Sequence, residues 1–435
     1  MNDKNNMSRY AKSIEHLERA ERTIPLGSQT FSKSRTLFPV GISPLYVSRG
    51  RGAEIWDIDG NKYIDLISAL ASVTLGYGDK AVEKAVNTQL KKGVSLSLPG
   101  ILEAEVSELI VEMVPSAEMV RFGKNGSDAT AAAIRLARAF TGRDHILVCG
   151  YHGWQDWYIG STTRNKGVPE SVSSLTHKFE YNNIDSLKLV LSSLENQVAA
   201  VIMEPMNITY PLPGFLEEVQ LLTRNAGALL IFDETITGFR YSKGGAQELF
   251  GVIPDLSTFG KGMANGFPLS AVVGRRDVMM EMEEIFFSGT FGGELLSLAA
   301  SKVVLERNLN EDVSGDLTDI GNRLNSKVNQ LIIDNKMEST LSLSGHPTWT
   351  FLIWQSNELN SVNELKTYFM QESFKRGLLV ESTHNVTLAF SEKIIKRATE
   401  IYEQVFQEIG KNIQEGNVLK ELQVKPLAPL FRTRG

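Results

Sequence analysis

The sequence predicts an α/β protein built around a mostly parallel sheet with helices on both faces. From about residue 79, short apolar runs alternate with helical segments, a pattern that indicates βαβ units. One apolar run, residues 228–232, ends abruptly at Asp233 and Glu234. A doubly wound sheet presents the carboxyl ends of its strands at one edge, which is the usual place for a ligand. These two acids therefore mark the first candidate site.

The chain is expected to divide into an N-terminal segment (1–78), a large domain (79–304) and a C-terminal α+β part (305–435). Residues 7–22 predict an amphipathic helix because apolar residues recur at intervals of three and four. The strands that we expect are residues 45–47, 53–57, 119–122, 146–148, 198–203, 228–232, 269–274 and 350–354. The further helices that we expect are residues 81–91, 102–114, 320–332 and 392–410.

Composition restricts the kind of protein. The 435 residues include 42% hydrophobic and 22% charged residues, which is typical of a globular protein with a real core. The formal charge of −6 is spread along the chain and predicts no binding to nucleic acid. Cys149 is the single cysteine, so no internal disulfide can form, as expected in a reducing cytoplasm. The sequence shows neither a signal peptide nor a run near the ~20 apolar residues of a membrane helix, so we expect a cytoplasmic protein without membrane partners.

A lysine between two glycines, Lys261, follows Asp233 after 28 residues. The flanking glycines allow the backbone to turn tightly around a bulky group. Pyridoxal phosphate chemistry requires such a pair, because the lysine forms a Schiff base and the carboxylate keeps the ring nitrogen protonated. Taken alone, each element has an ordinary explanation: a loop with a solvated lysine, and an acid at the start of a helix. Their combination with the residues described next favours the cofactor.

Two other predicted strand ends carry suitable residues. Gly126 and Ser127 follow the strand at 119–122 and open an alanine-rich helix, whose free backbone amides suit a phosphate. A helix cap without a ligand would look the same. Tyr151 follows the strand at 146–148 and could stack on a flat ring, although it could also belong to an aromatic cluster with Trp154. The adjacent His152 is either a proton shuttle or a hydrogen-bonded structural histidine.

Residues 233–240, Asp-Glu-Thr-Ile-Thr-Gly-Phe-Arg, and 259–262, Phe-Gly-Lys-Gly, resemble the paired signatures of the class III aminotransferases. The similarity extends over roughly residues 26–405 and is greatest to the glutamate-1-semialdehyde aminomutase-like branch. It implies the fold type I of pyridoxal phosphate enzymes, with a small domain built from both chain ends. It also implies a Lys261 aldimine, a Lys261 amine that moves the substrate proton, and Asp233 as the partner of the ring nitrogen.

The resemblance assigns further residues to the cofactor. Gly126 and Ser127 match the branch's Ser-Gly-Thr-Glu-Ala run and become phosphate contacts, and Tyr151 of Tyr-His-Gly becomes the stacking residue. Glu204 ends an apolar strand before a proline, where a buried carboxylate needs partners, and the family places this glutamate close to the cofactor. Asn182 matches an asparagine near the cofactor.

Thr290, within Ser-Gly-Thr-Phe-Gly-Gly, matches a threonine that family members place on the cofactor phosphate of the partner subunit. The resemblance therefore implies a homodimer with shared active sites. Without the resemblance, the same residues are a glycine-rich loop that leads into a helix from Glu294.

The substrate side departs from the branch. The semialdehyde aminomutases carry a Ser-Pro-Val-Arg run whose arginine holds a substrate carboxylate, whereas this chain has Lys33 and Arg35 without a clean match. Glu294 replaces an asparagine, and His384 lies in a divergent segment. Three hypotheses remain: an aminotransferase acting on an aldehyde or ketone that could be sugar-like, an aminomutase, and a binding protein that has lost the chemistry.

Overall fold

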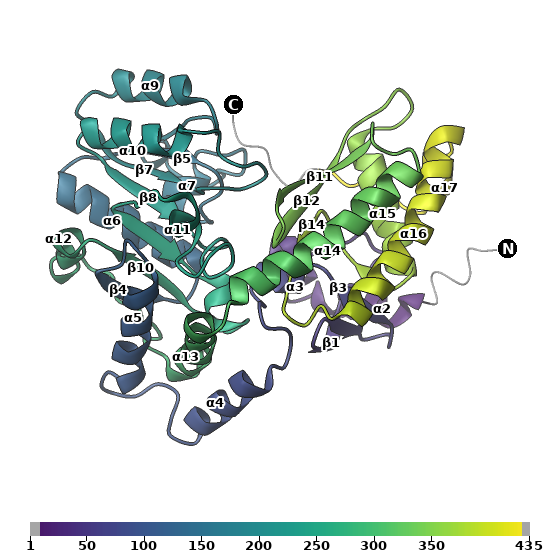
Figure 1. Cartoon of the computed structure of the whole chain (residues 1–435), viewed down its shortest axis with the longest axis horizontal. Coiled ribbons are helices and arrows are strands. Elements are labelled where there is room, and N and C mark those ends of the chain that lie inside the picture. The colour runs from purple at the N-terminus through teal and green to yellow at the C-terminus, as the bar shows by residue number, and fades with distance from the viewer. Residues whose placement is uncertain (1–8, 429–435) are drawn as a thin grey trace. The chain divides into compact units, whose positions relative to one another are not determined.

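The computed structural model describes residues 9–428, which form two compact units (Figure 1). Among the described residues, the small unit comprises residues 9–68, 75–78 and 317–428, and the large unit comprises residues 69–74 and 79–316. The second boundary therefore lies beyond the expected position after residue 304. The reason is helix α13 (Leu295–Asn310), which packs along α4 (Lys80–Leu90) and α5 (Ile101–Met113) of the large unit and continues past that position.

A seven-stranded sheet forms the centre of the large unit. Its spatial order is β4-β10-β9-β8-β7-β5-β6. All neighbours among β5 to β9 pair in parallel, whereas β10 pairs antiparallel with both β4 and β9. The mostly parallel sheet is therefore confirmed. The strands are β4 (Met119–Gly123), β5 (His145–Cys149), β6 (Thr176–Lys178), β7 (Val198–Met203), β8 (Leu229–Asp233), β9 (Leu256–Phe259) and β10 (Ser270–Gly274).

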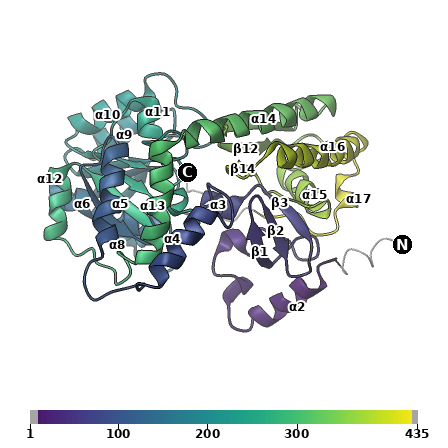
Figure 2. The ribbon, with the colours of Figure 1, turned by 60° about the horizontal axis from the view of Figure 1, so that its bottom comes forward.

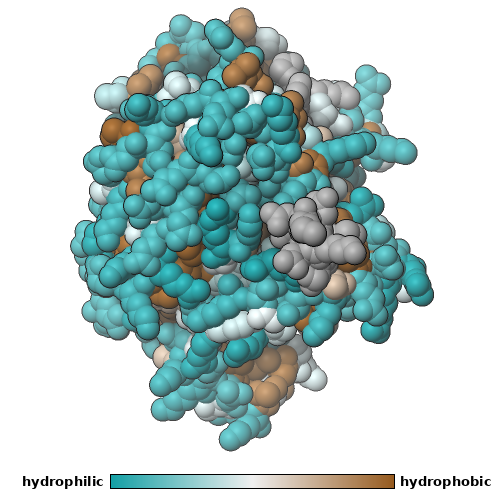
Figure 3. Space-filling model, turned by 90° about the vertical axis from the view of Figure 1, so that its right-hand side faces the viewer, coloured by the Kyte–Doolittle hydropathy of each residue, from teal (hydrophilic) through white to brown (hydrophobic). Residues whose placement is uncertain are grey.

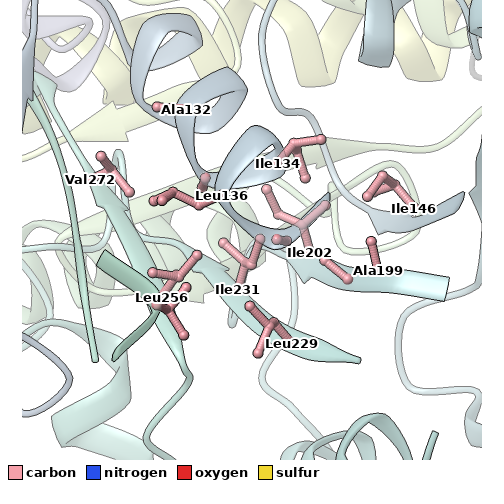
Figure 4. Packing of buried hydrophobic residues seen from close by; sticks show 14 of the residues in the cluster. Ala132, Ile134, Leu136, Ile146, Ala199, Ile202, Leu229, Ile231, Leu256 and Val272 are labelled. Carbon is pink, nitrogen blue, oxygen red and sulfur yellow. The ribbon is translucent and has the colours of Figure 1, made fainter. Parts of the chain in front are cut away.

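Helices cover both faces of this sheet (Figure 1). On one face, α6 (Gly126–Thr141) packs Ile134 and Leu136 against alternate residues of the strands, such as Ile202 and Ile231 (Figure 4). The intervening residues, such as Val201, face a second cluster on the other side. Burial on both faces explains why these strands read as continuous apolar runs. The other helices of the unit are α7 (Asp156–Ile159), α8 (Glu170–Ser173), α9 (Ile184–Ser193), α10 (Phe215–Asn225), α11 (Ala246–Phe250), η3 (Lys261–Ala264), α12 (Arg276–Met279) and η4 (Met280–Glu283).

Both ends of the chain build the small unit. Strand β13 (Leu378–Leu379) pairs in parallel with β3 (Lys62–Asp65), so the N-terminal and C-terminal parts share one sheet. The remaining strands are β1 (Val47–Arg51) and β2 (Glu54–Asp57) in that sheet, and β11 (Leu341–His346), β12 (Trp349–Trp354) and β14 (Thr383–Asn385) in a second sheet. The helices are η1 (Pro25–Gly27), η2 (Phe31–Lys33), α15 (Val362–Lys375), α16 (Glu392–Glu415), α17 (Val418–Glu421), and α14 (Val313–Asp334), which begins in the large unit.

Helix α2 (Ala11–Ala20) is shorter than the helix expected over residues 7–22, of which residues 7 and 8 lie outside the described part. It lies beside the strands β1 to β3 (Figure 2). The Asp59 carboxylate, in the turn between β2 and β3, accepts hydrogen bonds from the amides of Lys12 at 2.7 Å and Ser13 at 3.0 Å. This carboxylate satisfies the exposed amides that begin the helix.

The surface in Figure 3 is mostly hydrophilic, and hydrophobic residues appear on this face only in small separate areas. Scattered apolar residues of this kind are normal on protein surfaces. Within residues 9–428, we find no helix with the length and apolar character needed to span a bilayer.

A turn of unusual handedness begins the first segment of the large unit. Ser68, Ala69, Leu70 and Ala71 all have positive φ angles, between 47° and 64°, although none of them is glycine. A left-handed conformation costs an L-residue roughly 1–2 kcal/mol. Two contacts within the large unit hold the turn: the Ala71 carbonyl accepts from the buried Arg240 at 3.1 Å, and the Thr74 amide, three residues later, donates to Asn265 at 3.0 Å.

Candidate active site

A cavity of about 340 Å³ lies at the edge where the parallel strands end. Because β10 is antiparallel to both of its neighbours, β4 runs in the same direction as β5, β7, β8 and β9. Their carboxyl ends therefore meet at one edge, as a doubly wound sheet requires. The structure brings six of the expected residues together in the wall of this cavity: Gly126, Ser127, Tyr151, Glu204, Asp233 and Lys261.

The start of α6 forms one end of the cavity. Within the described residues, the backbone amides of Gly126 and Ser127 donate to no protein acceptor. Gly153, with a φ of +102°, lies so close that a side chain there would clash with the Ser127 hydroxyl. That hydroxyl also accepts a hydrogen bond from the Trp154 amide at 3.2 Å. Free amides at the positive end of a helix dipole suit a phosphate group.

Asp233 ends β8 and is held by four hydrogen bonds. His152 Nδ1 lies 2.9 Å from one carboxylate oxygen, and the other oxygen accepts from Thr258 at 3.0 Å and from the amide and hydroxyl of Thr235. Burial by itself raises the pKa of Asp233, but the bonds from His152 and Thr235 outweigh it and hold this pKa below its usual value. The carboxylate is therefore charged and able to keep a ring nitrogen protonated.

Lys261 follows β9 and has a left-handed backbone, with a φ of +42°. Burial lowers the pKa of its amine to about 8, although the nearby carboxylates of Glu204 and Asp233 favour the charged form. Gly262 is required here because a Cβ atom would lie 2.7 Å from the Thr74 hydroxyl. The lysine therefore presents an amine that is partly neutral at physiological pH.

Tyr151 and Glu204 form the wall between these groups. The Tyr151 ring meets Tyr158 edge to face at 5.6 Å, and its backbone amide donates to the Glu204 carboxylate at 3.1 Å. The Asn207 side chain donates to the same oxygen at 2.6 Å. Burial raises the pKa of Glu204.

Two expected residues lie outside this cavity. Thr290 is exposed and lines a neighbouring cavity of about 390 Å³ beside the start of α6. The Asn182 side chain donates to the Tyr210 carbonyl at 3.0 Å and accepts from the Leu212 amide at 2.9 Å, so it supports a loop. Their roles at the cofactor remain predictions.

Other residues discussed from the sequence have partners elsewhere. Glu234 binds the backbone amides of Ala246 and Gln247 and so caps α11. His384 is buried in the small unit between Asn325 and Tyr402, and burial lowers its pKa to about 3. Arg35 pairs with Glu21.

Several contacts of the site could not be predicted from the sequence. Thr258 and Thr235 carry no signal in the sequence, because a hydroxyl near a strand end has many uses. The ion pair between Lys124 and Glu294, at 3.1 Å, joins residues far apart in the chain. His152 stood beside the predicted Tyr151, and only the structure shows that it bonds to Asp233.

Comparison with known proteins now identifies the family. The model of the class III aminotransferases matches residues 38–412, most of the chain. The chain belongs to the class III aminotransferases. It is 32% identical over 388 residues to the 3-aminobutyryl-CoA aminotransferase of Cloacimonas acidaminovorans, covering 87% of this chain and 92% of that protein. It is 39% identical over 331 residues to the glutamate-1-semialdehyde 2,1-aminomutase of Syntrophobacter fumaroxidans, covering 72% and 76%.

Solved structures agree with this class III fold. The FumI protein of Sphingopyxis sp. MTA144 superposes with a TM-score of 0.87 at 26% identity and covers 96% of this chain and 99% of its own. An omega-transaminase from Sphaerobacter thermophilus gives a TM-score of 0.83 at 26% identity and covers 92% and 99%. The fold type I expectation is therefore confirmed.

Pyridoxal phosphate is the cofactor of this class III enzyme, and the residues of the cavity fit it. The free amides at Gly126 and Ser127 suit its phosphate, Asp233 suits its ring nitrogen, and Lys261 suits its aldehyde. When bound, the cofactor supplies a reactive aldehyde carbon and a ring that accepts electrons. We predict that, with the cofactor bound, the Asp233 carboxylate would hold the ring proton and the Lys261 amine would take up and return the substrate proton. The aminotransferase and the aminomutase remain as hypotheses.

Proposed function

We propose that this enzyme is an aminotransferase that moves an amino group from a small-molecule donor to an uncharged aldehyde or ketone, with a hydroxylated, sugar-like acceptor as the candidate. One observation carries the proposal: no arginine within the described part of the chain lines the cavity. Of its two lysines, Lys261 serves the cofactor, and Lys124 pairs with Glu294 at the phosphate end of the cavity. These features disfavour an acidic substrate.

An aminomutase is the second candidate, because several relatives carry that name. The substrate of the named aminomutases is an amino acid semialdehyde, which carries a carboxylate. The sequence offered Lys33 and Arg35 as candidates to hold a carboxylate, and Arg35 already pairs with Glu21. This pairing favours the aminotransferase.

A donor screen on the holoenzyme separates the two activities. An aminotransferase should lose the visible absorbance of the bound cofactor with one amino donor and recover it with one acceptor, and mass spectrometry then identifies the carbonyl product. An aminomutase should convert a single amino aldehyde to its isomer without any added partner. Conversion of glutamate 1-semialdehyde at a rate typical of enzymes would overturn the proposal of an uncharged acceptor.

We also infer a homodimer. Leu98, Ile101 and Phe286 expose 79%, 80% and 80% of their surface. Leu98 and Ile101 belong to one segment, and Phe286 belongs to an adjoining one. The segments are joined by a 2.9 Å hydrogen bond from the Leu295 amide to the Val94 carbonyl. An exposed apolar surface beside the active site is typical of a subunit interface. A second copy covering this surface would bring its exposed Thr290 loop toward the phosphate end of the cavity.

Subunit mixing tests the shared site. Thr290→Ala should weaken cofactor affinity roughly ten- to a hundredfold, as for the loss of one hydrogen bond to a charged group. Inactive Lys261→Ala chains are then mixed with Thr290→Ala chains at low cofactor concentration. If Thr290 acts across the interface, one site of each mixed dimer carries neither change and activity reappears. A mixture as inactive as its parents, with subunit exchange demonstrated, would place Thr290 outside the partner's site.

A cytoplasmic location belongs to the same proposal. It is supported by Cys149, which is buried and has no disulfide partner, as is usual in a reducing compartment. Fractionation of the native host, with the enzyme followed by immunoblot, tests it. Recovery in an extracytoplasmic fraction would contradict it.

A further inference from the structure

The ion pair between Lys124 and Glu294 lies at the phosphate end of the cavity, and none of the roles described so far involves it. Lys124 is the first residue after β4 and lines both the cofactor cavity and the neighbouring cavity that contains Thr290. Its ammonium lies 3.1 Å from the Glu294 carboxylate. The side chains are largely buried, with 19% of Lys124 and 14% of Glu294 exposed.

The position is an unfavourable one for a lysine. Lys124 precedes α6 by two residues, and the positive end of a helix dipole repels a cation. Withdrawing an ammonium and a carboxylate from water also costs free energy that their attraction does not always return. A lysine at this place therefore points to an anion that binds nearby.

Glu294 fixes the position of the Lys124 ammonium but does not use all of its N–H donors. The carboxylate is itself fixed, since it accepts the amides of Leu296 at 2.7 Å and Ser297 at 3.2 Å at the start of α13. An ammonium has three N–H donors. Among the described residues, Glu294 is the one acceptor that Lys124 Nζ contacts. Donors remain for a ligand in the cavity.

We propose that Lys124, held in place by Glu294, is a further binding residue for the phosphate group of the cofactor. It adds a full positive charge to the site that the amides of Gly126 and Ser127 form. The proposal concerns only cofactor capture, so it is independent of the donor and acceptor of the reaction.

Binding of pyridoxal phosphate and of pyridoxal to the apoenzyme tests this role, because the two molecules differ only in the phosphate. Lys124→Met keeps an unbranched side chain of nearly the same length and removes the charge. It should raise the dissociation constant of pyridoxal phosphate roughly ten- to a hundredfold and change that of pyridoxal less than about threefold. Lys124→Arg restores the charge and should recover most of the affinity. Glu294→Gln, which keeps the shape of the anchor, should cost only a few-fold.

Salt dependence supplies a second readout. The affinity of the wild type for pyridoxal phosphate should fall with added salt more steeply than that of Lys124→Met, because a charge pair is screened only where both charges exist. Thermal melting of the apoenzyme verifies that Lys124→Met is folded. Unchanged affinity for pyridoxal phosphate in Lys124→Met would overturn the proposal, and so would an equal loss for both molecules.

Discussion

Two helices of equal length, α6 and α13, begin side by side in the large unit. Their first backbone amides differ in whether a protein group accepts their hydrogen bonds. At α13, the Glu294 carboxylate occupies the N-terminus by accepting two backbone amides. At α6, the amides of Gly126 and Ser127 are left without a protein acceptor and face the cavity. The same helix dipole is therefore satisfied internally in one case and reserved for a ligand in the other. The difference depends on the residue that precedes each helix.

We expect the largest change in cofactor affinity when a carboxylate is placed before α6, as Glu294 is placed before α13. Asn125→Glu places a carboxylate immediately before Gly126, at the position equivalent to Glu294. Two like charges ~4 Å apart repel by about 4 kcal/mol at an effective dielectric constant of 20. The dissociation constant of pyridoxal phosphate should therefore rise by about a thousandfold, as measured by titration of the apoenzyme.

Asn125→Gln is the matched control, because it lengthens the side chain without adding charge. It should change the affinity by less than about tenfold. Equal losses in the two variants would show that shape, and not charge, limits access to the α6 amides.

A change at the strand end should separate binding from chemistry. Asp233→Asn keeps the shape of the side chain but removes the charge that holds the ring proton. Turnover should fall by ~10²-fold or more, the loss typical of a missing charge stabiliser, while the α6 amides still hold the phosphate. Steady-state kinetics with cofactor in excess measures the loss. Wild-type turnover with cofactor bound would refute the role of Asp233.

Gly153 tests how accurately the Ser127 hydroxyl must be placed. Gly153→Ala would clash with this hydroxyl and should weaken cofactor affinity by about tenfold, as for one lost hydrogen bond to a charged group. Gly142, at the other end of α6, also has a positive φ, but no atom lies within 4 Å of a Cβ there. Gly142→Ala should therefore strain the backbone without changing the affinity. Equal affinity losses in both variants would point to a general loosening of the helix.

The smallest expected effect is a pH dependence of the rate at which the cofactor aldehyde attaches to Lys261. Binding of the cofactor phosphate should not show this dependence. Because burial lowers the pKa of Lys261 to about 8, its amine should lose its proton between pH 7 and 9. Only the neutral amine attacks the aldehyde, so the rate of cofactor attachment should rise about fivefold from pH 7 to 8 and level off above pH ~9. Stopped-flow absorbance of the apoenzyme measures this rate. Pyridoxamine phosphate, which lacks the aldehyde, should bind with no such dependence; a midpoint near 10 would contradict the lowered pKa.

The sequence predicted the strands well, and six of the residues expected at the cofactor do line one cavity, because both expectations depend on local patterns. Residues 198–203 form β7 as expected, and residues 228–232 form β8 with a shift of one position. Long-range pairings left no such pattern. The partners of Asp233, the ion pair of Lys124 and the position of Asn182 depend on loops that meet only in the folded chain.

The left-handed turn at residues 68–71 could not be predicted from the sequence either, since such a turn normally requires glycine. It also has a consequence for the order in which the large unit assembles. A strained turn cannot persist in the unfolded chain, so it must wait until Arg240 and Asn265 are in place to bond Ala71 and Thr74. Both partners lie in loops that follow β8 and β9. The central strands should therefore form first, and the turn should close last and open first in hydrogen exchange.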